Sequence, residues 1–347
     1  MDIGDDKMQE QKKVTMADIA KRLGVSKGLV SMALSGSDEV KDETRAEIVL
    51  AALDMGYDIN KRKIAKNKKD IISIVCTDLS YFNTFFWTEV LKGVENYLSS
   101  HNYGIDLVVY KEGQDAFLLD AIDKKTKGLI VVASCDNAQY KFLSKANIPM
   151  VLVDVNNFCG LGSDSVRASN YYSAYRAAQY FVQKGHDSVA FVGAAGQALS
   201  FKARRDGFLA GIEACGGENV EYTEVIEPPV GLKYTTFNEK KTRRMLMRPN
   251  RPTAIMCAND ITAIGVFDIM EKLGLKCPDD VSLIGFDNIR YDHPLIRSLT
   301  TIDVQKQKMG EEAARALIKR VNNPSSPCLS IEVVADLIER NSVKNLK

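Results

Sequence analysis

The sequence predicts an α/β protein with an N-terminal all-α helix-turn-helix unit and a bilobal domain built from two parallel sheets. Near the N-terminus, apolar residues recur at helical spacing. From residue 71 onward, short apolar runs alternate with amphipathic helices, which is typical of parallel strands joined by crossover helices. The alternation restarts near residue 188 and indicates a second, similar lobe. At 347 residues the chain is long enough for such a set of domains.

Residues 14–35 carry the helix-turn-helix pattern. Thr15, with Asp18 three places on, predicts a capping box at the start of a first helix. Gly24 ends that helix and Ser26 caps a second one. Two short helices joined by such a turn are typical of a motif whose second helix enters the DNA major groove. An ordinary helical hairpin has the same pattern. The apolar faces consist of Met16, Ile19, Ala20 and Leu23, then Val30, Ala33 and Leu34.

A third helix, from about residue 42 to 55, completes a helical domain at 14–58, after a tail at 1–13 that we expect to be disordered. Residues 59–70 form a basic hinge or linker that carries six lysines and arginines between positions 61 and 69. The whole chain is nearly neutral, with 46 basic and 45 acidic residues. Any contact with DNA must therefore come from a local patch, and we interpret this segment as a phosphate-binding one rather than a solvated linker.

Residues 71–347 form the predicted bilobal domain. Polar residues end several of its apolar strands, and ligands of parallel sheets bind at the carboxyl ends of strands. The residues in question are Asp78, Asp154, Asn259, Asp260 and Asp287. The alternative is that they only cap the helices that follow, an interpretation we prefer for Asp260. Strands are expected at 71–76, 105–110, 128–133, 149–154, 188–193, 254–258 and 281–286, and helices at 85–98, 202–214 and 261–273.

The N-terminal stretch resembles the headpiece of the lac repressor family of bacterial transcription regulators. The matching residues, from Val14 to Leu34, are VT-x-x-DIA-x-x-x-GVS-x-x-x-VS-x-x-L. Later matches are Thr44, Arg45, Gly56-Tyr57 with Asn60, the segment LTTIDVQKQKMGEEAARAL and the final DLIERNSV. The resemblance covers nearly the whole chain. It implies a periplasmic-binding-protein-like domain with lobe 1 at about 71–160 and 289–322, and lobe 2 at about 161–288 and 323–347.

The resemblance also implies a homodimer on a near-palindromic operator in double-stranded DNA. Lys27, Gly28 and Met32 would read bases, and Ser26 and Ser31 would hold phosphates. Gly28 departs from the family, in which many members carry a large side chain there. The hinge departs as well, with Lys66 where a leucine is usual. The predicted DNA-binding residues are Thr15, Ser26, Lys27, Gly28, Ser31, Met32, Asn60, Lys61, Arg62 and Lys63.

A small-molecule effector bound between the lobes is the second implication. Arg204, in Arg204-x-x-Gly207-Phe208, matches the ligand-binding arginine of the family. Phe86 is either core or a stacking platform for a sugar ring. Carboxylates, an amide and a bidentate arginine favour a sugar or sugar derivative, and a purine stays open. The predicted effector-binding residues are Asp78, Asn83, Phe86, Asp154, Arg204, Asn259 and Asp287.

Other classes of function lack their motifs. No complete GxGxxG, no GxSxG and no plausible Cys-His pair is present, so we expect no enzyme, no catalytic residue and no cofactor. Seven scattered cysteines and three histidines predict no metal site and a reducing cytoplasm. The polar N-terminus is unlike a signal peptide, and no apolar run spans a membrane. The alternatives left open are control by a protein corepressor and a solute-binding protein without a regulatory role.

Overall fold

The structure, a computed structural model, describes two units, residues 1–69 and residues 70–347, and each is treated by itself. The described residues are 14–35, 40, 44–45, 47–48, 51–52, 55, 57, 70–76, 85–109, 122, 125–132, 137–154, 163–193, 199–216, 221–226 and 239–347.

The helices are α1 (Met16–Leu23), α2 (Lys27–Ser35), α5 (Phe85–Ser100), α7 (Asn137–Ser144), α8 (Asn170–Gln183), α9 (Leu199–Ala214), α10 (Glu239–Leu246), α11 (Asp260–Lys272), α12 (Pro294–Ser298) and α13 (Lys306–Asn322). The strands are β1 (Ile71–Cys76), β2 (Gly104–Val109), β3 (Thr126–Val132), β4 (Met150–Val153), β5 (Asp164–Ala168), β6 (Ser188–Gly193), β7 (Glu221–Ile226), β8 (Ala254–Cys257), β9 (Ser282–Phe286), β10 (Thr300–Asp303), β11 (Ser330–Val333) and β12 (Asp336–Ile338).

The first unit contains the predicted helix-turn-helix. Thr15 and Asp18 form the capping box of α1, with the Thr15 amide donating to the Asp18 carboxylate at 2.8 Å. Gly24 follows with φ of 66°, a left-handed conformation that glycine adopts without strain. The Ser26 hydroxyl accepts a hydrogen bond from the Leu29 amide at 3.0 Å and so caps α2. The core of this unit contains Ile19, Val30, Ala33, Leu34, Ile48 and Ala52, and the predicted faces of α1 and α2 are confirmed.

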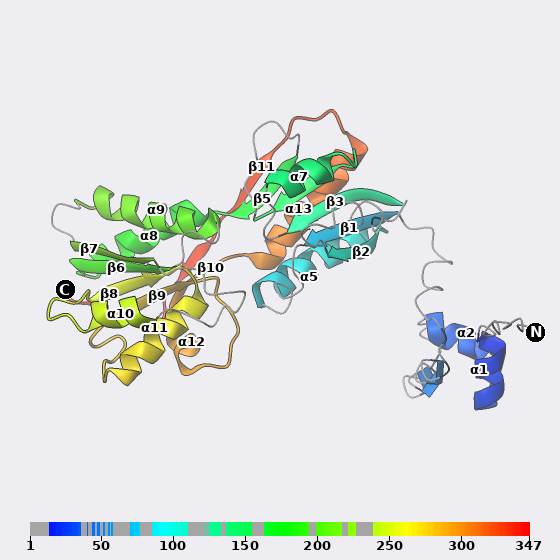
Figure 1. Ribbon diagram of the computed structural model, residues 1–347, viewed down its shortest axis with the longest axis horizontal. Coiled ribbons are helices and arrows are strands. Elements are labelled where there is room, and N and C mark those ends of the chain that lie inside the picture. The colour runs from blue at the N-terminus through cyan, green and yellow to red at the C-terminus, as the bar shows by residue number, and fades with distance from the viewer. Residues whose placement is uncertain are drawn as a thin grey trace, which may run out of the picture. The chain divides into compact units, whose positions relative to one another are not determined.

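The second unit has two lobes, each built on a six-stranded sheet (Figure 1). The strand orders are β11-β5-β4-β3-β1-β2 and β12-β10-β9-β8-β6-β7, and β12 is antiparallel to its neighbour. Side chains that alternate along a strand face opposite sides of the sheet. Val189 and Phe191 of β6 thus pack in the same cluster as residues of α8 and α9, whereas Ala190 and Val192 pack with α10 and α11. The predicted α/β class is confirmed.

Three strands lie in a different lobe from the one that the sequence predicted. β5 and β11 lie in the first sheet, where Ile331 pairs with Val166, although we placed both strands in lobe 2. β10 lies in the second sheet, where Thr301 pairs with Gly285, although we placed it in lobe 1. The reason is that the chain crosses between the lobes within the connections β5–α8, β10–α13 and β11–β12, and each crossing follows a short strand rather than a loop.

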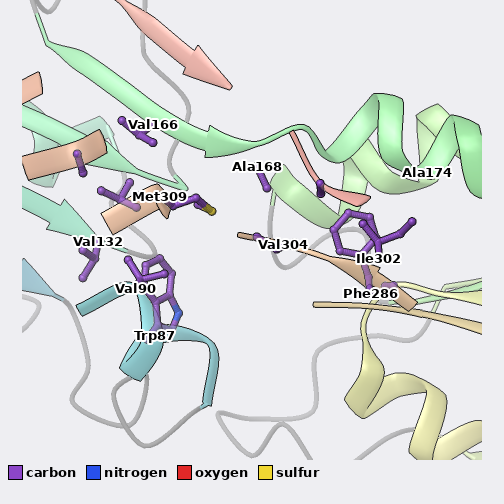
Figure 2. Close-up of a cluster of buried hydrophobic side chains, with 14 of the residues drawn as sticks. Trp87, Val90, Val132, Val166, Ala168, Ala174, Phe286, Ile302, Val304 and Met309 are labelled. Atoms are coloured by element: carbon purple, nitrogen blue, oxygen red, sulfur yellow. The ribbon is translucent and has the colours of Figure 1, made fainter. Parts of the chain in front are cut away.

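One cluster of buried apolar side chains continues through these crossings. It includes Trp87 and Val90 of α5 in the first lobe, and Phe286 and Ile302 in the second. Figure 2 shows Ala168, at the end of β5, and Val304, just after β10, between these two groups. The lobes therefore share buried surface at the crossovers. A change in the orientation of one lobe relative to the other would alter the packing there.

The helices α5 and α13 approach each other closely because a glycine on each helix faces the backbone of the other. A Cβ at Gly310 would overlap the carbonyl oxygen of Val90, and one at Gly93 would overlap the carbonyl oxygen of Gln307. Backbone atoms cannot give way without separating the two helices. This crossing packs α13 tightly against α5 of the first lobe.

Gly310→Ala should therefore lower the free energy of unfolding by about 1–3 kcal/mol, the usual cost of overpacking a tight core. Urea unfolding of the full chain measures it, with the exposed Lys319→Ala on the same helix as control. In an open helix, alanine instead stabilises relative to glycine, by roughly 0.5–1 kcal/mol. A gain in stability for Gly310→Ala would mean that the helices are not packed in this way.

Candidate functional site

The outer face of α2 presents the predicted base-reading residues. Lys27 and Gly28 are exposed in its first turn, and Met32 is 37% exposed one turn further on. A Cβ at Gly28 would meet the Ser26 hydroxyl only at 3.7 Å, an ordinary contact. The fold therefore has room for a larger side chain there, and the glycine is not required by packing.

Thr15 and Ser26 both serve as helix caps, as described above, while Ser31 is half-buried on α2. The Ser26 hydroxyl, which accepts from a backbone amide, retains its own hydrogen for donation to a phosphate, whereas the Thr15 hydroxyl already donates to Asp18 Oδ2 at 2.6 Å. The roles of all these residues toward DNA stay predictions. The predicted site residues Asn60, Lys61, Arg62, Lys63, Asp78 and Asn83 lie outside the described residues.

Arg204 is the centre of the predicted effector site. It lies on α9 and is only 3% exposed. Its Nε donates to Asn170 Oδ1 at 2.9 Å, its Nη1 to the Ala258 carbonyl at 2.7 Å, and its Nη2 lies 3.0 Å from Asp287 Oδ1. The guanidinium carbon also lies 3.7 Å from the ring centre of Phe286. Arg204 thus holds α8, β8 and β9 together at their ends, in addition to any contact with a ligand.

Asp287 ends β9 in a left-handed conformation, with φ of 99°. Its amide donates to the Ile302 carbonyl at 2.9 Å, and its own carbonyl accepts from the ammonium group of Lys306. Its carboxylate oxygen Oδ1 is buried within ion-pair distance of Arg204, but receives no hydrogen bond from the described residues. The ion pair with Arg204 compensates the burial of this oxygen, and a carboxylate oxygen has two lone pairs, so it can also accept a hydrogen bond from a ligand.

Asp154, from the first lobe, lies close enough to Arg204 and Asp287 to be affected by their charges. It follows β4, and the side chains of Ser200 and Arg204 on α9 both act on its carboxyl and lower its pKa. Burial raises the pKa of Asp154 to about 6; the charge of Arg204 opposes this rise and that of Asp287 adds to it. The structure therefore gathers Asp154 and Asp287, which the rule of strand ends selected, around Arg204, which the family resemblance selected.

The neighbouring residues Asn259 and Asp260 have roles that differ from our interpretation. Asn259, not Asp260, caps α11, because its Oδ1 accepts from the Thr262 amide at 2.8 Å. The cap does not use the amide donors on Nδ2, which stay a candidate ligand contact. Asp260 is 1% exposed and accepts from Thr301 Oγ1 at 2.6 Å and from the Ile289 amide at 2.8 Å. It therefore ties β10 and the segment after β9 to α11.

Phe86 is partly buried and packs edge to face on Trp87, with 5.1 Å between the ring centres. Trp87 belongs to the core, so a stacking role toward a ligand stays a prediction for Phe86 alone.

Sequence reasoning missed Asn170, Ser200 and Lys306. Asn170 and Lys306 begin helices that follow the crossover strands, and because those strands carry polar residues they gave no apolar run to mark their ends.

The described residues contain no group of three or more histidines, cysteines or acidic residues placed to hold a metal ion. Within the same residues, no helix is long and apolar enough to cross a membrane.

Comparison with known proteins gives matches over nearly the whole chain. Residues 15–81 match the model of bacterial regulatory proteins of the lacI family, and residues 178–343 match that of a periplasmic binding protein-like domain. The HTH-type transcriptional repressor PurR of Proteus mirabilis is 30% identical over 343 residues, which cover 95% of this chain and 96% of the relative. The chain belongs to the lacI family of bacterial regulatory proteins.

Solved structures of other regulators share the fold of this lacI-family protein. A LacI family regulator from Enterococcus faecium with bound ribose is 23% identical, covers 80% of this chain and 100% of its own, and has a TM-score of 0.64. The lac repressor dimer bound to operator and an anti-inducer is 19% identical, covers 96% and 100% of the two chains, and has a TM-score of 0.67. As a lacI-family member, the protein is a DNA-binding transcription regulator and not an enzyme.

Proposed function

We propose that this lacI-family regulator is a homodimeric repressor whose affinity for a near-palindromic operator changes when a small molecule occupies the site formed by Asp154, Arg204 and Asp287. The observation that carries this proposal is the meeting of the two lobes at that site. Ser200 and Arg204 of one lobe act on the Asp154 carboxyl of the other, and Arg204 also pairs with Asp287 at 3.0 Å. A ligand inserted there would alter how the lobes contact each other, and a coupling of about 1–3 kcal/mol gives a several-fold to hundred-fold response.

The structure also contains a physical connection from this site to the first lobe. Lys306 is the first residue of α13, and its ammonium donates to the carbonyl of Asp287 and to that of Val304 at 3.0 Å. It is 7% exposed. A shift of Asp287 on effector binding would thus reach the start of a helix that packs on α5.

A sugar is the effector class that we favour, because carboxylate oxygens accept hydrogen bonds from hydroxyl groups and the Asn259 Nδ2 group can donate to them. The regulator from E. faecium was solved with ribose, and the relatives named PurR make a purine the second candidate. Both classes offer several hydrogen-bond donors. The DNA site is the better place to begin, because it supplies the assay for either class.

Selection of DNA sites from a random pool tests the proposal, using the full-length protein at near-physiological salt. A palindromic consensus with half-sites about one helical turn apart is expected for a dimer. Adding sugars or purine bases should then change the affinity for the selected site. Failure to recover a consensus, with and without these compounds, would contradict sequence-specific binding.

Lys27→Ala should weaken binding to the selected operator by about 1–3 kcal/mol while changing non-specific binding little, because a lysine at this position of α2 would donate to guanine edges. Titrations on the operator and on a scrambled duplex, across several salt concentrations, measure both effects. Lys21→Ala, an exposed lysine on α1, is the control. An equal loss on both duplexes would make Lys27 a phosphate contact.

A further inference from the structure

The outer side of α10, on the second lobe, carries a dense cluster of positive charge. Residues 240–251 contain six lysines and arginines and no acidic residue, although the chain as a whole has a net charge of only +1. Among them Arg243, Arg244 and Arg248 are exposed, and Met247, which lies between these arginines, is 64% exposed. We call these four residues the α10 patch.

The opposite side of α10 fixes the patch to the lobe. Met245 and Leu246 are at most 2% exposed and belong to the same buried cluster as Val266 and Met270 of α11, the helix beside α10 (Figure 1). Because residues three and four positions apart share one face of a helix, burial of this side turns the arginines toward solvent. The patch is therefore presented by a packed helix and the turn that follows it.

The charge of the α10 patch is not neutralised within the described part of the chain, where its arginines form no ion pair. Other exposed basic residues do have acidic partners. Arg251, at the end of the same segment, lies 3.8 Å from Asp280, and Lys308 on α13 lies 2.9 Å from Glu312. The guanidinium groups of the patch are therefore available to a partner molecule.

The stability of α10 accounts for only part of this pattern. Arg243 and Arg244 lie in its last turn, where the helix dipole favours positive charge. Lys240, one turn before Arg244, adds a like charge at a spacing that opposes helix formation. Arg248 lies beyond the end of the helix, and the exposed Met247 gains nothing from the dipole. These features are typical of a surface that another molecule covers.

The composition of the patch favours an acidic segment of another protein over a nucleic acid. Arginine and methionine are enriched in protein–protein interfaces, whereas lysine is depleted there. A guanidinium group binds a carboxylate through two parallel hydrogen bonds. An apolar side chain of a protein segment can cover Met247, and a phosphate backbone has no such side chain to offer.

We propose that the α10 patch docks an acidic segment of a partner protein. In this segment an apolar side chain packs on Met247, and the carboxylates around it pair with Arg243, Arg244 and Arg248. The contact involves no residue of the proposed effector site and none of the predicted DNA-binding residues. It therefore stands or falls separately from the proposed function.

Selection from a library of short random peptides, displayed on phage, tests this proposal on the full-length protein. The Arg244→Glu/Arg248→Glu double variant is the counter-selection target. Enriched peptides should carry several acidic residues around an apolar one. In fluorescence anisotropy, an enriched peptide should bind the double variant about ten- to hundred-fold more weakly, because each reversal replaces an attraction by a repulsion. Arg176→Glu, at an exposed arginine of α8, is the matched control and should change the affinity little.

Met247→Ser tests the apolar part of the contact. It should weaken binding of an enriched peptide by about ten-fold, in line with the apolar area of one side chain, and should have no effect once the apolar residue of the peptide is serine. Urea unfolding shows that the variants, all changed at exposed side chains, are folded.

Two results would overturn the proposal. One is a selection that enriches no acidic peptides, or peptides that bind the double variant equally well. The other is a double variant that binds a scrambled DNA duplex more weakly and with a shallower salt dependence than the unsubstituted protein, because the patch would then be a nucleic-acid surface.

Discussion

Arg204→Ala should lower the free energy of unfolding of residues 70–347 by about 3–5 kcal/mol, the range for breaking a buried ion pair by removing one partner. The change leaves the carboxylate of Asp287 buried without its cation. It also removes the hydrogen bonds to Asn170 and to the Ala258 carbonyl. The response to effector should be lost together with stability.

Urea unfolding of the full chain, followed by fluorescence of Trp87, measures the stability change. Arg205→Ala is a matched control, because Arg205 is the next residue of the same helix, its side chain is 32% exposed and it forms an ion pair with Asp206. The control should change stability by less than about 1 kcal/mol, as surface ion pairs do. Unchanged stability in Arg204→Ala, with loss of the effector response alone, would show that Arg204 acts on the ligand and not on the scaffold.

The sequence predicted the elements with a strong apolar pattern. The strands β1, β3, β4, β6, β8 and β9 read as continuous apolar runs because both faces of a parallel sheet are buried. The two helices of the first unit could be predicted down to their caps, since capping depends on residues only three positions apart. These local signals do not depend on where the rest of the chain lies.

The crossovers could not be predicted in the same way. β5 reads DSVRA and β11 reads SIEV, with polar residues where the central strands have apolar ones. Asp164 of β5 is buried and accepts two hydrogen bonds from Arg320 of α13, 156 residues away. A buried polar pair of this kind looks like two surface residues in the sequence. The lobe to which each short strand belongs therefore depended on contacts that the sequence does not reveal.

The residues of the candidate site also fall into two groups, those that a local sequence pattern reveals and those that depend on contacts between distant residues. Asp154 and Asp287 could be selected because they follow recognisable strands. The separate roles of Asn259 and Asp260 could not be predicted, because either residue can cap a helix. What distinguishes them is Gly285 of β9, where a Cβ would overlap the Asp260 carboxylate. The missing side chain at Gly285 makes room for the buried carboxylate of Asp260. This role of Gly285 becomes evident only from the packing of the folded chain.

Asp260→Asn should stabilise the protein at neutral and alkaline pH and have little effect in acid. Burial raises the pKa of Asp260 from 3.8 to about 7 in the folded protein, although hydrogen bonds from Thr301 and from the Ile289 amide oppose this rise. Below pH 3.8 both folded and unfolded chains are protonated, and the carboxyl has no charge penalty. Between pH 4 and 7 the unfolded chain loses the proton while the folded chain keeps it, so stability falls as pH rises.

Above pH 7 the whole penalty is present, and three pKa units correspond to roughly 4 kcal/mol. Asparagine can keep both contacts, with its oxygen accepting from the Ile289 amide and its NH2 group donating to Thr301 Oγ1. Urea unfolding at pH 5 and pH 8 should therefore show a gain for Asp260→Asn over the unsubstituted protein that is larger at pH 8. The exposed Asp336→Asn serves as control. A gain that is equal at both pH values, or a loss at pH 8, would mean that Asp260 is ionised in the folded protein throughout this range and that its charge stabilises the connection to β10.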